Sequence, residues 1–361
     1  MDKLTQERQA RILGLDVLRI LSMVMIVGLH LLGQGGILEA AELGSGAWYA
    51  SRCLQCLFYC AVDCYGLLSG YVGTCRGRNG PRLLILWLTV VLYSCLFALF
   101  FRWRSPELVG KDAFIHALFP VLTRQYWYFT AYFGMSLLLS RMEGASAVLT
   151  GGRGVRSFAA LTVFFCLLPT LLHSDPFHMR GGYSLIWLTV LYLMGAALRR
   201  DRFFQRLGSG ILVLSGLICL ILTYASILQP MTFPYFGDFT LLNYTSPTIT
   251  VFAGCLVLLL GRIRGKRGKG ACIVTGLARS SFSVYILHTN PLLWWLAFRP
   301  GCLQQWAVWP AWKLVLAVPA ASAAVYLVCA LADRFRILAF RALRLRELAE
   351  GLFDRIFPPE N

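Results

Sequence analysis

Apolar residues fill the chain in long runs, and polar residues gather in the short segments between them. A helix that crosses a bilayer needs about 20 mostly apolar residues. The pattern therefore predicts an all-α polytopic membrane protein with about ten transmembrane helices, in which residues 1–333 form a single domain. The predicted spans cover residues 13–33, 48–72, 83–101, 125–141, 157–173, 184–199, 209–229, 246–261, 279–298 and 313–332. The fourth, sixth and eighth are short for a hydrocarbon layer of about 30 Å.

The composition of the 361 residues agrees with this interpretation. Hydrophobic residues make up 58% and charged residues 14%, whereas a soluble domain has about 25% charged residues. These values exclude a disordered chain, a coiled coil and almost any soluble enzyme. The opening residues are polar and of mixed charge, so we expect the first apolar run to be a span and not a cleaved signal peptide.

Basic residues are distributed unequally between the connecting segments. The net charge is +17, and 25 of the 34 Lys and Arg residues lie in the two ends and in every second loop. Because cytoplasmic loops are enriched in Lys and Arg, both termini are predicted to be cytoplasmic. The alternation with apolar runs argues against nucleic-acid binding. Residues 334–361 mix Arg with Leu, Phe and Ile, which predicts an amphipathic basic tail lying on membrane lipid.

Four cysteines are spaced by three and four residues in the second span: Cys53, Cys56, Cys60 and Cys64. They share one face of one helix, and successive turns of a single helix cannot surround a tetrahedral metal. We therefore predict no metal site. The role of this cysteine stripe stays open.

The first span contains three ionisable residues, Asp16, Arg19 and His30. At about 100° per residue they share one helix face, with Arg19 and His30 about 16 Å apart along the axis. Ionisable residues inside a membrane are costly, which makes them candidates for a functional site. The alternative is structural: Arg19 reaches the interface while paired with Asp16, and His30 is a hydrogen-bonded core residue.

Two other spans contain intramembrane polar residues. His288 precedes Thr289, Asn290 and Pro291, and the proline is able to kink its helix. His288 is a candidate to face His30 across the bundle, and a satisfied buried histidine is the alternative. Asp63 in the second span is a weaker candidate.

Two further groups have both a structural and a functional interpretation. Tyr126, Trp127 and Tyr128 open the fourth span and fit an interfacial aromatic belt or a substrate site. The basic loop residues Arg76, Arg78 and Arg82 fit positive-inside topology or a phosphate-binding cluster.

The order of these motifs resembles the acyltransferase-3 family of integral-membrane acyltransferases, from about residue 11 to residue 333. The motifs that match are Arg11 with Asp16, Arg19 and His30, then Ser69–Gly70–Tyr71, Tyr126–Trp127–Tyr128, the stretch at 182–196, and FSVYILHTNPL at 282–292. One feature departs from the family, which often has Arg-x-x-Arg at the start of the third span. Here Arg82 is followed by Ile85, so that a basic partner has to come from Arg76 or Arg78 or is missing.

The resemblance implies O-acylation of an envelope or exported glycan, or of a lipid-linked sugar, in the bacterial cytoplasmic membrane. Acetyl-CoA is the expected donor, with its phosphates near Arg19 and the cluster of Arg76, Arg78 and Arg82. His30 is expected to act as general base or to receive the acyl group first, with His288 as a further proton carrier and Asp16 orienting Arg19. Tyr126, Trp127, Tyr128 and Asp63 are the expected substrate-binding residues, together with the aromatic loop at 230–245.

A multispan transporter of a small molecule or glycan precursor is the alternative function. Transporters also have ionisable residues near the middle of the membrane, but they commonly contain inverted repeats and paired broken helices. Neither feature is evident in this sequence.

Overall fold

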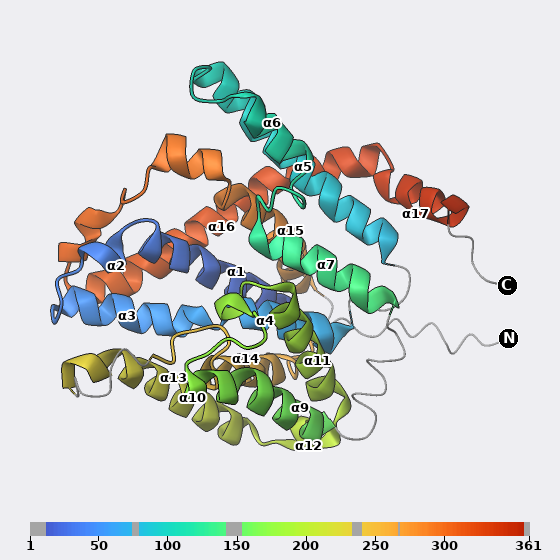
Figure 1. The fold of residues 1–361 in the computed structure, drawn as a ribbon. Coiled ribbons are helices and arrows are strands. Elements are labelled where there is room, and N and C mark those ends of the chain that lie inside the picture. Colours follow the sequence, from blue (N-terminus) through green and yellow to red (C-terminus); the bar gives the residue numbers. More distant parts are fainter. Residues whose placement is uncertain (1–11, 74–78, 142–153, 233–239, 266–267, 357–361) are drawn as a thin grey trace, which may run out of the picture.

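The computed structural model describes residues 12–73, 79–141, 154–232, 240–265 and 268–356. These residues form helices and no strand (Figure 1). The longer elements are α1 (Leu13–Gly33), α3 (Gly46–Tyr59), α4 (Ala61–Val72), α5 (Gly80–Arg104), α7 (Trp127–Arg141), α9 (Gly154–Thr162), α11 (Leu185–Arg200), α13 (Ser209–Thr232), α14 (Pro247–Leu260), α15 (Lys269–His288), α16 (Ala311–Ala342) and α17 (Leu345–Ile356). The shorter ones are α2 (Ile37–Ala40), α6 (Lys111–Leu118), α10 (Leu168–Leu172) and α12 (Arg202–Arg206).

Each predicted span coincides with a helix or a helical run. The second is made of α3 and α4, and the fifth of α9, a π-helical turn at Val163–Leu167, and α10. The ninth differs most from its prediction. Its helix begins at Lys269 rather than at 279, and ends at His288 because Pro291 lacks the N–H that would continue it. A separate π-helix follows at Leu293–Phe298.

Seven helices in the described part of the chain are long and apolar enough to cross a membrane. The other three predicted spans correspond to α7, α11 and α14, which have 15, 16 and 14 residues. These are the spans that the sequence already marked as short. The fold class is confirmed, while the count of ten and the cytoplasmic location of the termini stay predictions.

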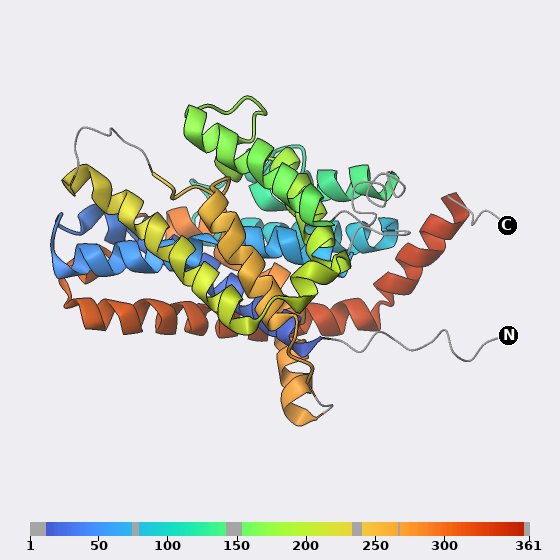
Figure 2. The same cartoon turned by 90° about the horizontal axis from the view of Figure 1, so that it is seen from below.

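Helix α1 lies at the centre of the bundle. It packs against α15 and α16 on one side and against α3 and α4 on the other (Figure 1). Helix α16 runs the length of the molecule and continues beyond residue 334 to Ala342, so the predicted tail begins as an extension of the last span (Figure 2). Helix α17 then turns away and packs on α5.

Helices α4 and α11 approach closely enough to require glycine. A Cβ atom added to Gly70 would lie 1.8 Å from the carbonyl oxygen of Tyr192, and one added to Gly195 would lie 1.9 Å from that of Leu67. Gly70 and Gly195 therefore provide the small surfaces across which these two helices pack. This contact holds α4 against α11.

Candidate active site

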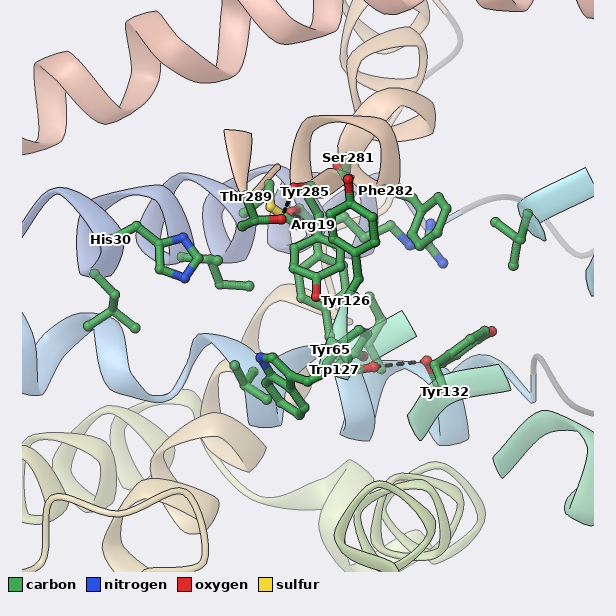
Figure 3. A pocket seen from close by; sticks show the side chains of 18 of the residues that line it. Arg19, His30, Tyr65, Tyr126, Trp127, Tyr132, Ser281, Phe282, Tyr285 and Thr289 are labelled. Carbon is green, nitrogen blue, oxygen red and sulfur yellow. Dashed lines mark hydrogen bonds between the residues drawn. The ribbon is translucent and has the colours of Figure 1, made fainter. Parts of the chain in front are cut away.

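The polar face of α1 agrees with both interpretations of its ionisable residues, the ion pair and the functional site. Asp16 is fully buried and accepts a hydrogen bond from Arg19 Nη1 at 2.7 Å and one from Thr275 Oγ1 at 3.1 Å. Tyr65 donates its hydroxyl to the carbonyl of Arg19 at 2.6 Å. Arg19 is thus ion-paired, yet its side chain remains 27% exposed and lines an internal cavity (Figure 3).

His30 and His288 face each other across α1 and α15, as the sequence suggested. His30 Nδ1 lies 2.9 Å from His288 Nε2, and His288 Nδ1 lies 2.6 Å from the carbonyl oxygen of Val284. Because a carbonyl only accepts, His288 carries its proton on Nδ1 and offers Nε2 as an acceptor. In the neutral pair His30 then donates from Nδ1, which leaves a lone pair on its own Nε2.

Side-chain hydrogen bonds stabilise the helix break after His288. The indole of Trp294 donates to the carbonyl of His288 at 2.6 Å, and Asn290 Oδ1 accepts from the backbone N–H of Leu292 at 3.0 Å. Asn290 Nδ2 donates to the hydroxyl of Tyr126 at 2.9 Å, and Asn290 is completely buried. The break therefore connects the segment that holds His288 to the start of α7.

A cavity of about 590 Å³ extends along this face of α1. Helices α1 and α15 run parallel beside it, because Asp16 contacts Thr275 near one end and His30 contacts His288 near the other. Its lining residues include Arg19, Met23, Ile26, His30, Gln34, Tyr65, Arg82, Gln125, Tyr126, Trp127, Tyr128, Tyr132, Tyr183, Tyr244, Arg279, Tyr285 and Thr289.

Charge is distributed unevenly along the cavity. Three arginines line it: Arg19 in α1, Arg82 in α5 and Arg279 in α15. Arg82 lies in the first turn of its helix, and Arg279 lies near the level of Arg19, because Thr275, one turn before Arg279, bonds Asp16. No carboxylate side chain is among the described residues that line it. The arginine end is suited to bind an anion with several phosphates, and the histidine end is suited to exchange a proton with a bound hydroxyl.

Most of the predicted site residues meet at this cavity. Arg19, His30 and Arg82 line it. Tyr126, Trp127 and Tyr128 line it as well and do not form a belt facing lipid. Figure 3 shows Arg19, His30, Tyr126 and Trp127 around the cavity. Asp16 and His288 do not line the cavity but contact residues that do: Asp16 bonds Arg19, and His288 bonds His30. Arg76 and Arg78 lie outside the described residues.

Asp63 is the exception, because it does not line the cavity. It is fully buried and accepts hydrogen bonds from Trp187 Nε1 and from Thr250 Oγ1, each at 3.2 Å. Those donors belong to α11 and α14, so the carboxylate joins three helices. In the structure Asp63 supports helix packing and is not among the residues that line the cavity.

Some of the lining residues were not identified from the sequence. Arg279 is the first residue of the predicted ninth span, whereas α15 begins ten residues earlier, at Lys269, so that Arg279 lies in the middle of a helix. Tyr183 lies in the stretch at 182–196 that matches the family, and Tyr244 lies in the aromatic loop at 230–245, of which residues 233–239 are outside the described part of the chain. The sequence thus indicated the two segments, but not these two tyrosines individually.

The helical bundle and the cavity along α1 define a helical membrane protein with a candidate site beside the pair of His30 and His288. A family model described as an acyltransferase domain, Acyl_transf_3, matches residues 12–334. The chain belongs to the acyltransferase-3 family, and it is a membrane acyltransferase. The family assignment therefore favours the acyltransferase over the transporter that the sequence left as the alternative. No curated protein and no solved structure matches the chain.

Proposed function

We propose that this enzyme transfers an acyl group, most simply acetyl, from cytoplasmic acyl-CoA to a hydroxyl of an envelope or exported glycan. The proposed location is the bacterial cytoplasmic membrane. The observation that supports this most strongly is the His30 imidazole, whose Nε2 lone pair is available in a cavity with three arginines at its other end. One cavity thus has a region suited to a polyphosphate donor and a region suited to a neutral hydroxyl.

In the proposed mechanism Arg19, Arg82 and Arg279 bind the phosphates of the donor, and its thioester extends along α1 toward His30. Arg19 remains held by Asp16, which fixes the direction of its guanidinium. Arg76 and Arg78, on the segment before α5, remain expected donor-binding residues. Binding both substrates in one cavity would supply much of the rate enhancement through proximity and orientation.

His30 Nε2 then removes the proton from the acceptor hydroxyl as its oxygen attacks the thioester carbonyl. The carbon–sulfur bond breaks, and the same imidazole returns the proton to the departing thiolate of CoA. His288 stabilises the imidazolium, because its Nε2 accepts the Nδ1–H of His30 throughout. Direct transfer needs one histidine to act first as base and then as acid, and no acyl-enzyme is required.

The test is acetyl-CoA binding and slow thioester hydrolysis by the purified protein in detergent. We expect Arg19→Ala to weaken binding, and His30→Ala to abolish hydrolysis while binding persists. His116→Ala and Arg264→Ala, which alter exposed residues that do not line the cavity, are the matched controls. Absence of acetyl-CoA binding by well-folded wild-type protein would contradict the proposal.

A further inference from the structure

The histidine end of the cavity differs in chemistry from the arginine end. Its neutral hydrogen-bonding side chains are Gln34, Gln125 and Thr289, and its aromatic ones include Trp127, Tyr183 and Tyr244. Arg279 lies nine residues before His288 in α15, about 13 Å away along the axis. Among the described lining residues, this end has neither a carboxylate nor a guanidinium side chain.

Three aromatic side chains at this end form a continuous wall. The ring centroids of Trp127 and Tyr183 are 4.6 Å apart, and those of Tyr183 and Tyr244 are 5.3 Å apart. Tyr59 stacks behind Tyr244 at 4.5 Å. Tyr244 is 5% exposed, whereas Tyr183 is 44% exposed, so Tyr183 presents the accessible ring.

The backbone before Tyr183 is built to hold that ring in place. Gly182 has φ +98°, and a Cβ atom there would lie 2.4 Å from the Cβ of Tyr244. Only glycine therefore allows the turn to bring Tyr183 against Tyr244. Asp175 accepts hydrogen bonds from the backbone N–H of Met179 and of Arg180, both at 2.7 Å, which orders the loop.

Such a wall discriminates between possible acceptors by charge. A hydroxyl-rich ring can stack one face on Tyr183 and Trp127 while its edge bonds to neutral amides and hydroxyls. A ring with a carboxylate would lose hydration there without gaining a cationic partner, which is unfavourable. The carboxylate could not reach the arginines while the ring hydroxyl remains beside His30.

We propose that Trp127, Tyr183 and Tyr244 form an acceptor subsite that selects an uncharged sugar ring over the corresponding uronic acid. The inference rests on the proposed function for its biological meaning, since it assigns the acceptor end of that site. It adds a preference for the charge of the acceptor, which neither the donor-binding arginines nor the histidine pair determines. Tyr183 supplies the accessible stacking face, and Tyr244 holds it from behind.

Saturation-transfer NMR on the purified protein tests the subsite without requiring turnover. The probes are two matched pairs: methyl glucoside with methyl glucuronide, and methyl galactoside with methyl galacturonide. We expect at least one neutral member to bind, and its acidic counterpart to bind at least about tenfold more weakly. Tyr183→Ala should weaken binding of the neutral glycoside roughly tenfold, and Tyr183→Phe should retain it.

Tyr49→Ala is the matched control, because Tyr49 is similarly exposed, at 39%, and does not line the cavity. Equal binding within each pair, no binding of either neutral glycoside, or unchanged binding in Tyr183→Ala would overturn the inference. Acetyl-CoA binding is measured on the same samples. If the wild-type protein did not bind acetyl-CoA, the proposed function would be contradicted. The glycoside measurements would still show whether the acceptor subsite exists.

Discussion

Replacing His288 tests how the two histidines cooperate. His288→Met removes the Nε2 acceptor, which lies 2.9 Å from His30 Nδ1, and keeps a side chain of similar size. When His30 takes a proton, this contact becomes a hydrogen bond to a charged group, which is worth about 1.5–3 kcal/mol. At about 1.4 kcal/mol for each factor of ten, kcat should fall about 10- to 150-fold.

The KM for acyl-CoA should remain nearly unchanged in this variant. His288 does not line the cavity, and Arg279 lies nine residues earlier in the same helix. His288→Gln is the informative control, because its amide oxygen can accept the Nδ1–H of His30 and should restore much of kcat. Ala substitution is less suitable, because it would also leave a void at a residue that is only 5% exposed.

The assay is acyl transfer or thioester hydrolysis followed by chromatography of radiolabelled acetyl-CoA. Chromatography is preferable to a thiol reagent, because the twelve cysteines of the chain would contribute to the signal. Thermal melting confirms that each variant is folded. Equal kcat in the Met variant and wild type, or an equally low kcat in the Met and Gln variants, would refute the role assigned to His288.

Three further substitutions test the remaining parts of the structure. Arg279→Ala should raise the KM for acyl-CoA roughly tenfold with little change in kcat, and an unchanged KM in steady-state kinetics would remove it from the donor site. Gly195→Ala should destabilise the contact between α4 and α11 by about 1–3 kcal/mol, and an unaltered melting temperature in detergent would contradict that packing. Asp63→Asn should lower the melting temperature and leave the KM for both substrates unchanged, because Asp63 bonds only within the helix packing described above; a raised KM would return it to the substrate site.

Local pattern was sufficient to predict the helices. Each of the ten apolar runs coincides with a helical region of the structure, and the three runs that were short in sequence correspond to the three short helices α7, α11 and α14. The shared face of Arg19 and His30 also follows from helix geometry alone, and both residues line the cavity. Helix formation and the sharing of a helix face depend on residues a few turns apart in the same helix, and the sequence shows these residues directly.

The start of α15 shows where this approach fails. The segment before residue 279 is rich in Lys, Arg and Gly, so hydropathy assigned it to a loop. The helix nevertheless begins at Lys269, and packing against α1 and α16 places Arg279 beside the cavity. Packing between helices outweighs the weak helical preference of this polar segment, and a hydropathy pattern does not include such packing.

The sequence by itself determined the fold class, the helical regions and the polar face of α1, because helical periodicity and hydropathy are local properties. Only the tertiary structure decided that His30 bonds His288, 258 residues away, and that Asp63 points toward Trp187 instead of the cavity. It also decided that Tyr183 and Tyr244 join Trp127 in one wall. Which buried polar side chains become partners depends on how helices distant in sequence pack, since each must satisfy its hydrogen bonds where water is excluded.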